Sequence, residues 1–195
     1  MQLVFATNNT HKLQEARDIA GDGISIMSLK EIGCTEDIAE TSDTIEGNAL
    51  QKARYIYEHY GVDCFADDTG LFVDALDGAP GVMSARYAGT GHDAAANRAK
   101  LLGALGDTPQ RSACFKTVVA LIIDGAEHIF TGRVDGHITT HESGTSGFGY
   151  DALFAPTEAG GPTFAQMSEQ AKNNISHRGR ALRQMLHFLS ARTKP

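Results

Sequence analysis

Apolar and polar residues alternate in blocks that predict short strands and longer helices. The apolar run at 2–6 predicts a buried strand, and residues 10–21 follow with apolar positions at helical spacing. We expect a second strand at 24–27, a second helix at 42–61 that stops at a glycine, and a third strand at 62–66. This alternation of strand and helix is typical of α/β proteins.

The second half of the chain changes this pattern. Residues 92–106 predict a helix, and 111–140 read as two strands joined at Asp124–Gly125, a hairpin signal. A short strand is expected at 151–155 and a final helix at 176–192. The hairpin argues against an all-parallel sheet, so the predicted fold class is α/β with a mixed central sheet flanked by helices.

Composition limits the classes of function. The chain has 195 residues, 42% hydrophobic and 21% charged, which predicts one domain, or two lobes sharing a core. A net charge of -7 opposes nucleic-acid binding, which needs a basic face. The three cysteines are widely spaced, which favours reduced core thiols over a metal site. With no secretory apolar region and no membrane-spanning run, we expect a cytoplasmic protein without membrane contact.

The stretch "ATNNTHK" places a polar turn between the first strand and the first helix, with Thr10 as the expected cap. Backbone N–H groups at a helix start, with Lys12 in the first turn, would suit a phosphate. The alternative is a well-capped helix whose Lys12 lies in solvent.

Two adjacent carboxylates, Asp67 and Asp68, follow the apolar third strand. Neighbouring strand residues point to opposite faces, so both can serve one site only if the chain has turned, and one is expected to be structural. The other would hold a hard cation such as Mg²⁺, with Glu40 or Glu46 as a second carboxylate. Alternatively, both are turn or cap residues.

Two later segments carry candidate binding chemistry. "SGTSGFGYD" sets Phe148 and Tyr150 among glycines, where an aromatic face could meet a flat base, although a bulged strand end fits equally. Lys172 and the "SHRGR" stretch gather cations near the start of the last helix, which fits an anionic or carbonyl-bearing ligand or a solvated basic turn.

Six motifs in order resemble the inosine triphosphate pyrophosphatase family, also called Ham1-like proteins or XTP/dITP diphosphatases. They are "ATNNTHKLQE", "ETSDTIEGNALQKA", "FADDTGL", "GAPGVMSARYAG", "GTSGFGYDALF" and "KNNISHRGRAL", which together span nearly the whole chain. The resemblance implies an elongated, two-lobed domain over residues 1–195 around a nucleotide cleft, a homodimer, and Mg²⁺ as cofactor. It also implies hydrolysis of ITP, dITP and XTP to the monophosphate and pyrophosphate.

The resemblance also implies roles for individual residues. Asp68 would be general base and metal ligand, with Glu40 as second ligand, and Lys52 would help hold phosphate or position water. The implied substrate contacts are Thr7, Asn8, Asn9, Thr10, His11, Lys12, Thr69, Phe148, Gly149, Tyr150, Asp151, Lys172, His177 and Arg178. Gly47 departs from the family pattern, where many members carry a second Glu. Two rival functions are a Maf-like pyrophosphatase for modified pyrimidines and a nucleotide sensor without catalysis.

Overall fold

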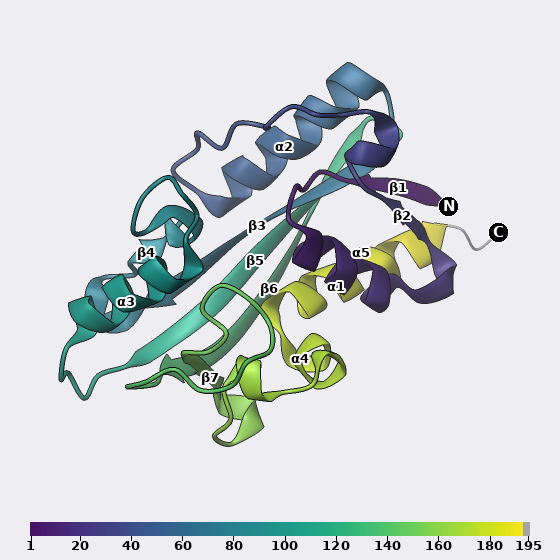
Figure 1. Cartoon of the computed structure of the whole chain (residues 1–195). Coiled ribbons are helices and arrows are strands. Elements are labelled where there is room, and N and C mark those ends of the chain that lie inside the picture. The colour runs from purple at the N-terminus through teal and green to yellow at the C-terminus, as the bar shows by residue number, and fades with distance from the viewer. Residues whose placement is uncertain (193–195) are drawn as a thin grey trace. The chain divides into compact units, whose positions relative to one another are not determined.

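The computed structural model describes residues 1–192, apart from the side chain of Asp22, and contains a sheet with five α-helices (Figure 1). The strands are β1 (Gln2–Phe5), β2 (Ser25–Met27), β3 (Cys64–Val73), β4 (Pro80–Gly81), β5 (Ser112–Ile123), β6 (Ala126–Ile138) and β7 (Phe154–Pro156). The helices are α1 (Thr10–Ala20), α2 (Ile45–Tyr60), α3 (Ala94–Leu105), α4 (Glu169–Ile175) and α5 (His177–Arg192). Within this part of the chain, no helix is long and apolar enough to cross a membrane.

The sheet is mixed, as predicted. Its strand order is β2-β1-β3-β5-β6-β7, with β4 paired to β3 outside this path. β1 pairs in parallel with β2 and with β3, whereas β3 with β4 and β6 with β7 are antiparallel. The expected hairpin is also confirmed, because β5 and β6 are neighbours joined by Asp124–Gly125.

The chain divides into two compact units. Of the described residues, the first comprises 1–68, 117–132 and 178–192, and the second comprises 69–116 and 133–177. Each has its own hydrophobic core. The expected single two-lobed domain and its nucleotide cleft stay predictions.

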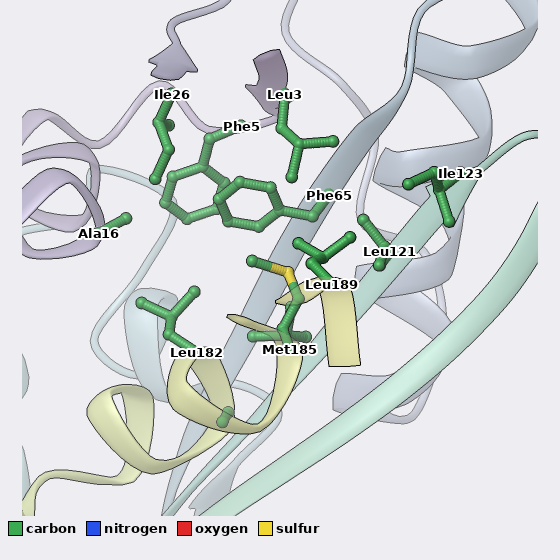
Figure 2. Close-up of a cluster of buried hydrophobic side chains, with 12 residues drawn as sticks. Leu3, Phe5, Ala16, Ile26, Phe65, Leu121, Ile123, Leu182, Met185 and Leu189 are labelled. Atoms are coloured by element: carbon green, nitrogen blue, oxygen red, sulfur yellow. The ribbon is translucent and has the colours of Figure 1, made fainter. Parts of the chain in front are cut away.

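In the first unit, α1 and α5 pack against the strands through fully buried side chains. Figure 2 shows Leu182, Met185 and Leu189 of α5 directed toward Phe5 and Phe65, whose rings stack with centroids 4.4 Å apart. Apolar residues at helical spacing on α5 form this face, as the sequence predicts. α2 lies on the other side of β3 (Figure 1) and buries Ala49, Ala53 and Ile56 along its own face.

The second unit encloses a core rich in aromatic rings. Phe115, Phe154 and Phe164 pack together, with the Phe115 and Phe154 centroids 4.8 Å apart. Leu101 and Leu105 of α3 belong to the same core.

Helix α2 ends at Gly61 as predicted, but it begins at Ile45 and not at the predicted position 42. Thr44 caps α2 by accepting from Gly47 N, and Gly61 ends it in the left-handed conformation. The expected cap at Thr10 is wrong by one residue, because Asn9 caps α1 through its side-chain oxygen. The sequence analysis missed the short helix α4, although Ser168 caps it and could have signalled it.

Candidate functional site

Strand β3 does not end before its two carboxylates but continues through both of them to Val73. Side chains alternate along an extended strand, so Asp67 and Asp68 leave β3 on opposite faces. Their partners agree: Asp67 contacts α1 and α5, whereas Asp68 contacts α2. The chain does not turn between them, and the expectation that one of the two carboxylates is structural stays a prediction.

Asp67 is fully buried between two cations. Its Oδ1 accepts from Lys12 Nζ at 2.9 Å, and its Oδ2 accepts from Arg178 Nε at 2.9 Å. Burial alone would raise the pKa of Asp67, but the charges of Lys12 and Arg178 outweigh it and hold that pKa well below the usual range. Arg178 Nη1 also forms an ion pair with Glu15. The two positive and two negative charges of these four residues therefore balance.

Asp68 is also buried, but its neighbours differ from those of Asp67. Its Oδ2 accepts from Asn48 Nδ2 at 3.1 Å, and Asn48 itself is buried in α2. Burial raises the pKa of Asp68, and the negative charge of Glu40 adds to this, while the charges of Lys52 and Lys12 oppose it. Glu40 forms an ion pair with Lys52.

Glu40 and Asp68 are the carboxylates expected to bind a divalent cation, and this stays a prediction. Among the described residues, no group of three or more His, Cys, Asp or Glu could hold a metal by itself. Glu40 and Asp68 nevertheless interact electrostatically, as two carboxylates that repel. Mg²⁺ is commonly held by one or two carboxylates together with substrate phosphates, so this pair matches its usual donor set.

The polar turn before α1 is partly occupied by its own cap. Asn9 Oδ1 accepts from His11 N at 3.0 Å and from Lys12 N at 3.2 Å, and Thr7 Oγ1 accepts from Asn9 N. Asn8, Thr10 and His11 are exposed. Three backbone donors of this turn, those of Asn9, His11 and Lys12, are thus already bonded, and the phosphate contacts of Thr7–Lys12 stay predictions.

A second charged group lies wholly in the second unit. Asp151 Oδ2 accepts from Lys172 Nζ at 2.8 Å and from Phe148 N at 2.8 Å. The Lys172 ammonium lies 4.8 Å from the centre of the Phe148 ring and 5.9 Å from that of Phe164. The structure brings Lys172, Asp151 and Phe148 together, and their predicted contacts with the substrate stay predictions.

The neighbouring residues hold this group in place. Gly149 O accepts from Arg98 Nη1 at 2.8 Å, and Tyr150 OH donates to Ser84 O at 2.8 Å. His177 stacks on Phe115 with centroids 4.5 Å apart. The sequence analysis singled out neither Arg98 nor Asn48, since no local pattern distinguishes them.

Arg178 and Thr69 complete the predicted set. Arg178 Nε and Nη1 are engaged by Asp67 and Glu15, so these two donors are not directed at a base. Thr69 follows Asp68 on β3 and is partly buried. The base contact of Arg178 and the substrate contact of Thr69 stay predictions.

The chain is an α/β protein with a mixed sheet flanked by helices. Its charged site gathers carboxylates and ammonium groups around strand β3. The chain belongs to the Ham1 family, whose model matches residues 3–188. It is 54% identical over 189 residues to the dITP/XTP pyrophosphatase of Porphyromonas gingivalis, covering 96% of this chain and 97% of that one. It is 52% identical over 191 residues to the Flavobacterium johnsoniae protein of the same name, covering 98% and 99%.

Two solved structures are similar along their whole length. The Ham1 protein of Staphylococcus aureus has a TM-score of 0.88 at 36% identity, covering 99% of this chain and 100% of that one. A HAM1 protein from Coxiella burnetii also has a TM-score of 0.88, at 38% identity, covering 98% and 99%. These likenesses confirm the fold class and the family that the six motifs indicated.

Proposed function

We propose that this protein hydrolyses the non-standard purine nucleoside triphosphates ITP, dITP and XTP to the monophosphate and pyrophosphate. Its relatives from P. gingivalis and F. johnsoniae carry the name dITP/XTP pyrophosphatase at more than half identity. The observation that carries the proposal is Asp68, a buried carboxylate fixed by Asn48, with Glu40, Lys52 and Lys12 close enough to influence its charge.

Each of these residues has a role in attack on a triphosphate. Asp68 accepts the proton of the attacking water, because a carboxylate held in place beside the reacting water can act as a general base. Lys12 and Lys52 offset the negative charge that builds up at the phosphorus and on leaving pyrophosphate. Glu40 and Asp68 would hold Mg²⁺, which supplies further charge neutralisation to the phosphates when bound.

The second charged group supplies the chemistry for a keto purine. The Phe148 ring offers a stacking face, and the Lys172–Asp151 pair fixes its loop. A donor such as His177 would pair with the 6-oxygen of hypoxanthine or xanthine, whereas the 6-amino group of adenine would leave it unpaired. A homodimer and a cytoplasmic location are further proposals, supported by the family resemblance.

Product analysis tests the proposal directly. Purified protein is incubated with ITP, dITP, XTP, the four standard triphosphates and modified pyrimidine triphosphates, with and without Mg²⁺. We expect monophosphate and pyrophosphate, formed from the deaminated purines only when Mg²⁺ is present. Release of diphosphate and phosphate would exclude this reaction, preference for pyrimidines would favour the Maf-like alternative, and no turnover at all would favour a sensor.

Asp68→Asn tests the role of the carboxylate. Loss of the general base should lower kcat by at least about 100-fold, while ITP binding is largely retained because the neighbouring cations are unchanged. Asp107→Asn is the matched control, since Asp107 is exposed in the loop after α3. Normal turnover of Asp68→Asn would remove Asp68 from the mechanism.

A further inference from the structure

We propose that Asp67 is a positioning residue that fixes the Lys12 ammonium with two of its N–H donors available to a polyphosphate. Asp67 is the neighbour of the proposed base but points to the opposite face of β3. The effect of Asp67 on catalysis rests on the proposed function. The positioning of the Lys12 ammonium by Asp67 does not depend on it.

Lys12 has hydrogen-bonding capacity that its contact with Asp67 does not use. An ammonium group carries three N–H donors. Among the described residues, Lys12 Nζ makes one hydrogen bond, to Asp67 Oδ1 at 2.9 Å. The side chain is only 15% exposed, so water reaches it poorly. A mostly buried cation with two donors lacking a protein partner is well prepared for an anionic oxygen.

Asp67 itself is firmly held. Its side chain has no exposed surface, and its two oxygens are divided between two cations, Lys12 and Arg178. Arg178 is in turn engaged by Glu15. Glu15 and Asp67 together compensate the charge of Arg178, so Asp67 is held by a buried guanidinium that is itself fixed while it anchors Lys12.

The four residues come from different elements of the fold. Lys12 and Glu15 stand three positions apart in α1 and so share a helix face. Asp67 comes from β3, and Arg178 from the first turn of α5. Because three packed elements of the first unit contribute, the Lys12 ammonium is fixed relative to the sheet and not only to its own helix.

A metal-free binding experiment tests this arrangement. Titration calorimetry measures the affinity for inorganic tripolyphosphate without divalent cations. If Asp67 positions Lys12, Asp67→Asn should weaken binding by about tenfold, since the ammonium loses its ionic anchor. If Asp67 is only a nearby negative charge, removing that charge should leave tripolyphosphate binding unchanged or tighten it. That result would overturn the proposal.

A double-mutant cycle supplies the second readout. Lys12→Ala and Asp67→Asn are each expected to lower kcat/KM for ITP by about tenfold or more, mainly through KM. In the Lys12→Ala background, Asp67→Asn should cost less than about twofold more, because the side chain that it positions is gone. Fully additive losses would show that Asp67 acts independently of Lys12 and would contradict the proposal.

Two further measurements keep the test decisive. If Asp67→Asn does not fold, Asp67→Glu preserves the charge but displaces Lys12 by one methylene, and the same tenfold loss of tripolyphosphate affinity is expected. Unchanged affinity in that folded variant would also refute the positioning role. Asp107→Asn should bind like the unmodified protein. Failure of the proposed function would appear separately, as absence of pyrophosphate release by the unmodified protein.

Discussion

Gly47, in the first turn of α2, is expected to tolerate no side chain while Ser42 is present. A Cβ at position 47 would lie 2.6 Å from Ser42 Cβ and 3.0 Å from Thr44 Oγ1, and closer still to Ser42 Oγ. Real Cβ atoms essentially never approach so closely, so Ser42 would have to move. Ser42 Oγ accepts from Thr44 N at 3.2 Å, and Thr44 Oγ1 accepts from Gly47 N at 3.0 Å, so movement would disturb the cap of α2.

The expected change in unfolding free energy of Gly47→Ala is the sum of three contributions. Forced repacking costs about 2 kcal/mol, and a weakened cap costs about 1 kcal/mol. Replacing glycine in a helix returns about 1 kcal/mol. The net expectation is a loss of about 2 kcal/mol of unfolding free energy, which for a chain of this size lowers the Tm by about 4–8 °C.

Ser42→Gly separates the clash from other effects. The Ser42→Gly/Gly47→Ala variant removes the obstructing side chain, so its stability should return to within about 1 kcal/mol of the unmodified protein. Urea unfolding followed by circular dichroism at 222 nm measures all four proteins, and an unchanged urea slope confirms that the comparison is valid. Gly47→Ala as stable as the unmodified protein, or additive effects of the two changes, would refute the reasoning.

The contact between Ser42 and position 47 also affects whether a glutamate at position 47 could bind a metal. A glutamate at Gly47 meets Ser42 before it can reach a metal, because its Cβ starts from the same position. Restoring the second Glu that many family members carry should therefore require Ser42→Gly as well. In this chain, Glu40 and Asp68 are expected to hold Mg²⁺ without it.

Two further predictions concern stability and reactivity. Lys172→Met should lower the unfolding free energy by about 3 kcal/mol, because it leaves Asp151 charged in a pair whose side chains are only 5% and 7% exposed. Adding Asp151→Asn should recover part of this loss in urea unfolding, and no recovery would show that the charge is not the cause. Burial raises the pKa of the Cys64 thiol to about 12, so at pH 8 only about one thiol in ten thousand is ionised. Iodoacetamide should leave Cys64 unmodified in the folded protein and label it in urea, as mass spectrometry of peptides would show; labelling of the folded protein would contradict its burial.

The local patterns predicted most elements because their causes are local. The 16-residue helix α2 follows from apolar spacing, with Gly61 as its stop. The turn at Asp124–Gly125 follows from two residues that accept positive φ. The end of the third strand was predicted too early, because two successive carboxylates read as a turn when their partners are unknown. The structure extends β3 to Val73, since cations and an amide from other elements compensate these charges.

By itself, the sequence determined the alternation of strands and helices, the mixed sheet, the family and the residues expected to carry chemistry. Only the tertiary structure decided which charges meet. Lys12 and Asp67 are 55 positions apart, Asp67 and Arg178 are 111 apart, and Glu15 and Arg178 are 163 apart. No periodicity spans such separations. A buried charge is stable only where the packing of distant elements places its counter-charge, so the distinct surroundings of Asp67 and Asp68 became visible only in the folded chain.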